Sequence, residues 1–84
     1  MKTLKEAYEG LRRENGFSHQ EIGRLQALTG LPMDFLKEHI RMECRAGNAT
    51  LATGDWSWAD DETRAGVIEV RGRKMILVKF KYWA

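Results

Sequence analysis

Three cationic residues lie around a glycine near the C-terminal end of the sequence, where Arg71, Arg73 and Lys74 flank Gly72. Arginine and lysine donate hydrogen bonds to phosphate oxygens, which supply much of the affinity of nucleic-acid binding. Residues 66–84 carry five basic and one acidic residue, although the whole chain has a net charge of only +2. This concentration indicates contact with a polyanion. The alternative is a charged turn that keeps a hairpin soluble or protects an edge strand.

A second set of charges recurs at helical spacing in the middle of the chain. Its predicted outward positions are Met33, Asp34, Lys37, Glu38, Arg41 and Arg45. Lys37 and Arg41 can donate to O6 and N7 of guanine, whereas Glu38 can only accept, as from a cytosine amino group. The like-charged pairs Asp34–Glu38 and Lys37–Arg41 do not favour a purely stabilising surface. Nucleic-acid contact, a solvated face and a protein contact remain the three interpretations of this face.

Catalytic and metal-binding patterns are weak. His39, Glu43 and Cys44 are neighbours on one predicted helix, but no second cysteine or histidine stands at ligand spacing. No phosphate-binding glycine loop or activated nucleophile is present. We therefore expect no enzyme, no metal and no cofactor. The single cysteine, the absence of an apolar run of about 20 residues and a charged N-terminus without a signal-peptide core predict a cytoplasmic protein.

The sequence predicts three helices over residues 1–47. Leu4, Ala7, Tyr8 and Leu11 define the first, which ends near residues 15–16. The second is predicted to begin at Ser18, with Glu21 completing a capping box and Phe17 and Ile22 forming a hydrophobic staple; it ends at Gly30. The third spans 32–46, with Pro32 at its first position and Gly47 closing it. Its predicted buried stripe is Phe35, Leu36, His39, Ile40 and Cys44.

Residues 48–84 change to a period of two, which predicts strands. The candidates are residues 49–53, 67–70 and 74–83, the last with Ile76, Val78, Phe80 and Tyr82 on one face. The turn at 71–73 joins the last two as a hairpin. The acidic segment 54–66 is predicted to be a long loop, with a possible short strand around Trp56–Trp58.

The three tryptophans, Trp56, Trp58 and Trp83, allow two interpretations. In a domain of this size they are expected to complete the core, although they can also stack on bases or fill a partner's pocket. The carboxylates of residues 54–65 are expected to be solvated. The alternative is an acidic patch that meets the basic surface of a second copy.

The segment LTGLPMDFLKEHIRMECRAGN, residues 28–48, resembles the helix-turn-helix of winged helix-turn-helix DNA-binding domains of the bacterial and phage transcriptional-regulator type. Leu25, Thr29, Gly30 and Leu31 match the first part of the pattern, and Leu36, the His39-Ile40 pair and Gly47 match the rest. The resemblance implies a single α+β domain over 1–84: three helices in 1–47, the helix-turn-helix at 18–47, and a small C-terminal antiparallel sheet and wing in 48–84.

The expected function follows from this resemblance. It is binding of double-stranded DNA as a transcriptional regulator, with the helix 32–46 in the major groove and the hairpin tip 71–74 on the backbone. A homodimer, or neighbouring copies on the DNA, is expected to be the binding unit. The alternative is a winged-helix module that binds a protein and not DNA.

Overall fold

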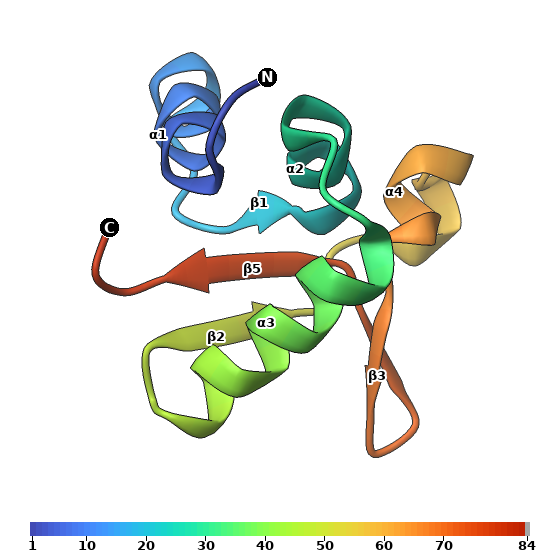
Figure 1. The fold of residues 1–84 in the computed structure, drawn as a ribbon. Coiled ribbons are helices and arrows are strands. Elements are labelled where there is room, and N and C mark those ends of the chain that lie inside the picture. The colour runs from blue at the N-terminus through green and yellow to red at the C-terminus, as the bar shows by residue number, and fades with distance from the viewer. Residues whose placement is uncertain (84) are drawn as a thin grey trace.

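The computed structural model describes residues 1–83 as a mixture of helices and antiparallel strands (Figure 1). In chain order the elements are α1 (Leu4–Asn15), β1 (Gln20–Glu21), α2 (Ile22–Thr29), α3 (Met33–Arg45), β2 (Ala49–Ala52), η1 (Trp56–Trp58), α4 (Asp61–Ala65), β3 (Ile68–Val70), β4 (Arg73–Met75) and β5 (Leu77–Phe80). The predicted α+β class is therefore confirmed.

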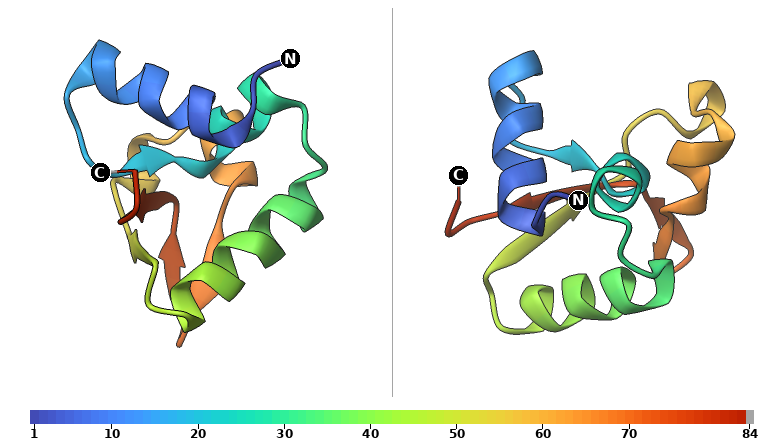
Figure 2. Two further views of the ribbon diagram at one scale, coloured as in Figure 1. Left: turned by 60° about the vertical axis from the view of Figure 1, so that its left-hand side comes forward. Right: turned by 45° about the horizontal axis from the view of Figure 1, so that its top comes forward.

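The main sheet has the order β1-β5-β2, so the last strand of the chain is the central one. Both pairings are antiparallel, and Val78 of β5 lies opposite Gln20 on one side and Leu51 on the other. The expectation of a sheet formed only by residues after 48 was wrong, because β1 comes from the segment between the first two helices. Figure 2 shows β5 running between the N-terminal helices and α3.

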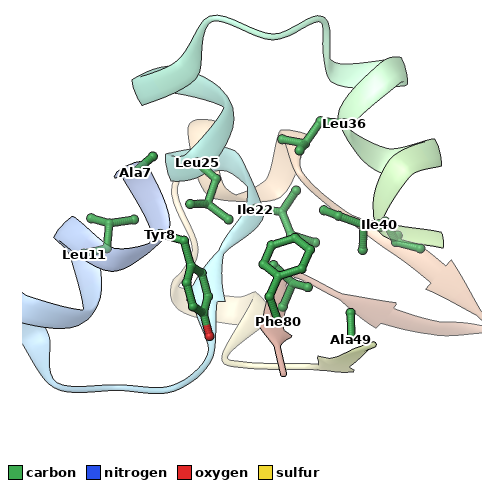
Figure 3. Close-up of a cluster of buried hydrophobic side chains, with 11 residues drawn as sticks. Ala7, Tyr8, Leu11, Ile22, Leu25, Leu36, Ile40, Ala49 and Phe80 are labelled. Atoms are coloured by element: carbon green, nitrogen blue, oxygen red, sulfur yellow. The ribbon is translucent and has the colours of Figure 1, made fainter. Parts of the chain in front are cut away.

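The core fills the space between the sheet and the three longest helices (Figure 3). Its largest buried side chains are Tyr8 of α1, Ile22 and Leu25 of α2, Leu36 and Ile40 of α3, Ile68 of β3, and Val78 and Phe80 of β5. The Tyr8 ring meets the Phe80 ring edge-on, with 5.4 Å between centroids. The hydroxyl of Tyr8 donates to the Ser18 carbonyl oxygen, so this buried polar atom is satisfied.

Helix α1 follows the predicted pattern, since Ala7, Tyr8 and Leu11 are its buried residues. Thr3 and Glu6 form a capping box at its start, and the hydrogen bonds to the carboxylate lower the pKa of Glu6. Gly16 ends the helix in the left-handed conformation, as predicted.

The start of α2 differs from the prediction. Ser18 caps nothing, Phe17 is 68% exposed, and the helix begins only at Ile22. The intervening residues 20–21 pair with β5, and the Ile22 amide donates to the Ile76 carbonyl oxygen at 3.0 Å. A strand partner from the far end of the chain therefore replaces the local cap and staple. The predicted end at Gly30 is confirmed.

Helix α3 has nearly the predicted bounds, but its orientation is only partly as expected. Pro32 lies at the N-cap rather than at the first helical position, and Asp34 is in the first turn. Leu36 and Ile40 are fully buried, whereas Phe35, predicted to be buried, is 60% exposed.

The long C-terminal strand predicted over 74–83 is divided at Ile76. Residues 73–75 pair with 68–70 in a separate hairpin, and residues 77–80 enter the main sheet. The Ile76 amide donates to the Ala52 carbonyl oxygen at 3.1 Å while its own carbonyl accepts from Ile22. The predicted hairpin is confirmed. Arg71 (φ 52°) and Gly72 (φ 78°) are both left-handed, as the two central residues of a type I′ hairpin turn must be.

The acidic segment is not a simple loop, and it contains no strand at Trp56–Trp58. It forms η1 and then α4, whose N-cap Asp60 accepts from the Thr63 amide at 2.8 Å; this bond lowers the pKa of Asp60. Helix α4 packs on α2 at two glycines. A β-carbon on Gly23 would lie 2.0 Å from the Glu62 carbonyl oxygen, and one on Gly66 would lie 2.4 Å from the Gly23 nitrogen.

We expect Gly23→Ala and Gly66→Ala each to lower the free energy of unfolding by about 1–3 kcal/mol, because backbone atoms of the facing segment occupy the space that a methyl group needs. Urea denaturation measures the effect. Gly10→Ala in α1 is the matched control. Its nearest neighbour would be Lys2 Nζ at 3.8 Å, so helix propensity should raise stability by about 0.5–1 kcal/mol. Equal stabilities of the Gly10 and Gly23 variants would contradict this close packing.

Candidate functional site

Most of the predicted site residues belong to one helix, α3, and its outer face is the first candidate site. Leu36 and Ile40 turn inward, and the exposed residues are Asp34, Phe35, Glu38, Arg41, Met42 and Arg45. Met33, predicted to point outward, is partly buried and packs against the core. Lys37 is half-buried at the margin of the face. The exposed face is thus narrower than predicted and contains two apolar residues that the prediction did not place there.

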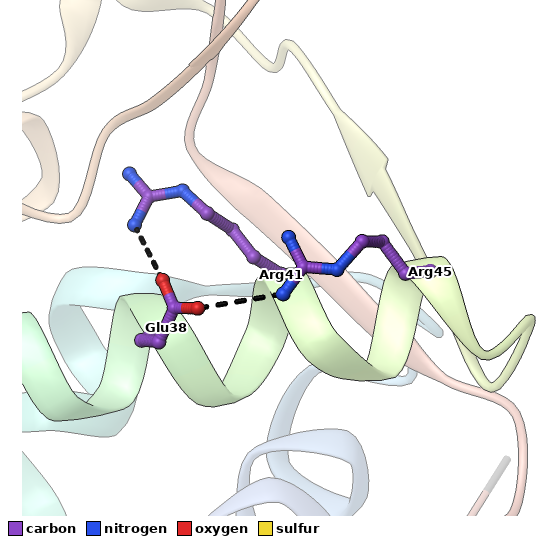
Figure 4. Close-up of polar contacts among 3 residues, drawn as sticks. All are labelled: Glu38, Arg41 and Arg45. Carbon is purple, nitrogen blue, oxygen red and sulfur yellow. Dashed lines mark hydrogen bonds and ion pairs between the residues drawn. The ribbon is translucent and has the colours of Figure 1, made fainter.

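Glu38 is the centre of the charges on this face (Figure 4). Its Oε2 lies 3.5 Å from Arg41 Nη1, and its Oε1 lies 3.4 Å from Arg45 Nη2. All three side chains are largely exposed, so each pair contributes at most about 1 kcal/mol to stability. The like-charged pairs expected from the sequence are therefore accompanied by attractive ones, and both guanidinium groups are held along one line of the helix surface.

Phe35 and Met42 add an apolar strip beside these charges. They are 60% and 55% exposed. At about 100° per residue, side chains seven positions apart differ by only about 20° around a helix, so both lie on one line. The same geometry places both residues far around the helix from the buried Ile40. Helical spacing therefore predicts that Phe35 is exposed, whereas its apolar side chain favours burial.

The hairpin β3–β4 carries the second predicted site. Arg71, Gly72, Arg73 and Lys74 are all exposed at or beside its turn. In Figure 1 this hairpin extends away from the body of the molecule, in the lower half of the view together with α3. The structure therefore presents two separate basic features, the C-terminal half of the α3 face and the hairpin tip.

Lys74 differs from the two arginines of the tip. Its Nζ lies 4.6 Å from the centroid of the Trp56 ring, and Arg64 Cζ lies 5.0 Å from the same ring. The Arg64 guanidinium also donates to the Trp56 carbonyl oxygen at 3.0 Å through Nη2. Trp56 thus links α4 and η1 to the hairpin, and Lys74 has a structural contact in addition to any role at the tip.

The tryptophans have three different environments. Trp83 is half-buried and packs on the core, as predicted. The centroids of its ring and the Phe80 ring are 5.0 Å apart. Trp56 is half-buried beneath two cations. Trp58 is 86% exposed, so the expectation of a core position was wrong for this residue. It lies on a 3-10 turn that Arg64 holds by its bonds to the Trp56 and Ser57 carbonyls.

Other kinds of site have little basis in the described residues. Among residues 1–83 no group of three or more His, Cys, Asp and Glu side chains is placed to hold a metal ion, and no helix is long and apolar enough to cross a membrane. Burial, and then the charge of Glu43, raise the pKa of the Cys44 thiol, which disfavours the nucleophilic thiolate. His39 lies beside Phe80, with 6.4 Å between ring centroids.

Comparison with known proteins adds no relative: no protein-family model matches the chain, and no curated protein or solved structure is significantly similar to it. Inference about function therefore depends on the geometry and chemistry of the surfaces described above.

Replacing Lys74 by alanine should lower the free energy of unfolding by about 0.5–1 kcal/mol, the usual contribution of an exposed cation over an aromatic ring. Arg73→Ala removes a cation from the adjacent position and should change stability by less than about 0.5 kcal/mol. Urea denaturation followed by circular dichroism compares the two variants. Equal effects would show that the Trp56 contact does not stabilise the hairpin.

Proposed function

We propose that this protein binds double-stranded DNA as a winged helix-turn-helix domain, with α3 in the major groove and the β3–β4 hairpin on the phosphate backbone. The chain order supports this proposal. Helix α1, strand β1, the pair α2–α3, strand β2, a segment with η1 and α4, the β3–β4 hairpin and strand β5 follow one another, and β1, β5 and β2 form one sheet. A helix-turn-helix reads DNA through the exposed side of its second helix. The observation that carries the proposal is that α3 buries Leu36 and Ile40 and exposes its opposite face.

Specific roles follow from the donors on each element. Arg41 can form a bidentate contact with guanine. Lys37 and Arg45, which lie on either side of Arg41 along α3, are suited to bases or phosphates. Glu38 holds Arg41 and Arg45 in place in the free protein and can accept from a cytosine amino group. Arg71 and Arg73 bind phosphates from the hairpin tip. Met33, which packs on the core, makes no base contact in this arrangement.

A single domain of this kind has a small interface, and useful affinity requires either two copies or adjacent sites. We therefore include a homodimer on DNA in the proposal, acting in transcriptional regulation. The exposed Phe35 and Met42 can contact thymine methyl groups, which are apolar features of the major groove.

Duplex DNA of random sequence tests the proposal directly. Affinity measured by fluorescence anisotropy should fall steeply as salt rises from about 50 to about 200 mM, because phosphate contacts release counterions. Glu38→Gln should raise affinity at low salt by about twofold to fivefold, since it removes an exposed carboxylate that pairs with two arginines. Glu14→Gln, an exposed change of the same charge on α1, should have little effect. No detectable binding at about 50 mM salt would overturn the proposal.

Two arginines should separate sequence recognition from backbone contact. Arg41→Ala should reduce discrimination between preferred and random duplexes by about 1–3 kcal/mol. Arg73→Ala should instead weaken binding to all sequences alike and reduce the slope of log affinity against log salt by about one. Binding selections and salt titrations on both variants measure these effects. Variants that bind like the unaltered protein would show that α3 and the hairpin are not the contact surfaces.

A second function, docking to another protein through α3, is favoured by one observation. The exposed Phe35 and Met42 lie beside arginines that Glu38 already pairs, so this face is less basic and more apolar than its arginine content suggests. Apolar anchors within a polar rim are typical of protein interfaces. Absence of DNA binding at low salt, together with a normally folded protein, would favour this function.

A further inference from the structure

A hollow of about 690 Å³ lies on a part of the molecule that neither α3 nor the tip of the hairpin reaches. Three parts of the chain line it: Asn15 and residues 17–21 before and within β1, the segment from Gly54 through η1 to Thr63 of α4, and the junction of β4 and β5 at Ile76 and Leu77. Its volume is in the range of about 300–1,000 Å³ that is usual for small-molecule sites. The core does not require this space, and the proposed DNA contact does not use it.

Two exposed aromatic rings contribute to the lining. Phe17 is 68% exposed and Trp58 is 86% exposed, and neither belongs to the buried core. They come from segments 41 positions apart in the chain, yet both line the same hollow. Leaving two large aromatic side chains in water forgoes about 1.5–3 kcal/mol that full burial of each would contribute. Their convergence on one cavity indicates a site for a flat apolar group.

The walls are held in place by hydrogen bonds. Asn15 and Gln20 exchange two side-chain bonds of 3.0 Å, and the Phe17 amide donates to Asn15 Oδ1 at 2.9 Å. On the opposite wall Arg64 Nη2 donates to the carbonyl oxygens of Trp56 and Ser57 at 3.0 and 3.3 Å. These bonds fix the backbone of both walls before a ligand enters, which reduces the entropic cost of binding.

The charges of the lining have one sign. Asp55 and Glu21 are carboxylates, and no lysine or arginine is among the lining residues. Burial, and then the nearby Lys79, lower the pKa of His19, which favours the neutral form of its ring. Glu21 Oε2 accepts from the Thr63 hydroxyl at 2.8 Å, which fixes that carboxylate at the wall. Among the lining residues an anionic ligand meets two carboxylates and no cation, whereas a cationic ligand finds two acceptors.

We propose that this hollow binds a small aromatic amine. The ring packs against Phe17, Trp58 and the apolar base formed by Ile76 and Leu77. The ammonium group lies at the side of Asp55 and Glu21. This site is separate from α3 and from the hairpin tip, so it does not depend on DNA binding.

Tryptamine is the probe, titrated into the full chain and followed by two-dimensional ¹H–¹⁵N NMR. We expect saturable shifts at His19, at Leu77 and at the Trp58 indole N–H. Indole-3-acetate, which keeps the ring but carries a negative charge, and butylamine, which lacks the ring, should each bind about fivefold more weakly or worse. Equal binding of all three compounds, or no saturable shift with tryptamine, would overturn the proposal.

Two variants locate the site. Trp58→Ala should abolish saturable binding, and Asp55→Asn should weaken tryptamine about fivefold while leaving indole-3-acetate no weaker. Phe35→Ala, which removes an exposed aromatic ring from α3, is the control and should bind tryptamine normally. The NMR spectrum of each variant confirms its fold. Unchanged binding by Trp58→Ala would contradict the assignment, as would sedimentation data showing a dimer that Trp58→Ala dissociates.

Discussion

Strand β5 pairs with β1 along one edge and with β2 along the other, while its inward side chains, Val78 and Phe80, are fully buried. The burial of each side chain contributes about 1.5–3 kcal/mol, a large share of the 5–15 kcal/mol that stabilises a typical domain. Because β1 precedes α2 and β2 follows α3, this one strand sets the positions of both helices.

The outer face of α3 is a consequence of that arrangement. Its inner residues Leu36 and Ile40 pack in the core beside Phe80, which leaves the line of Phe35 and Met42 and the Glu38 ion pairs in solvent. The free-energy contribution of these exposed pairs is small. The fold itself therefore gains little stability from the charged residues on this face.

The segment between β2 and β5 builds the remaining surfaces. Close contact at Gly23 and Gly66 holds α4 on α2, and within the segment Trp56 of η1 contacts Lys74 of the hairpin. The same segment places Trp58 at the hollow opposite Phe17. The segment between β2 and β5 thus contributes to both the basic hairpin tip and the proposed amine site, although the two lie on different elements.

Local sequence signals determined much of this fold. The apolar spacing of α1, the glycines that end α1 and α2, the extent of α3 and the Arg71-Gly72 turn depend on contacts between near neighbours in the chain, so these features could be predicted correctly. The candidate cations of α3 and the hairpin could also be identified from the sequence, and the structure places most of them on the surface. Their role in DNA binding stays a prediction.

Tertiary structure decided the features that depend on distant partners. Residues 20–21 became a strand instead of a capped helix start because β5 offers them a hydrogen-bonded partner. The 74–83 segment was divided because Ile76 bonds to both Ala52 and Ile22. The exposure of Trp58 also depended on which neighbours the fold supplied. Residue type alone indicates whether a side chain favours burial or a given backbone conformation, whereas long-range packing determines whether the fold provides it.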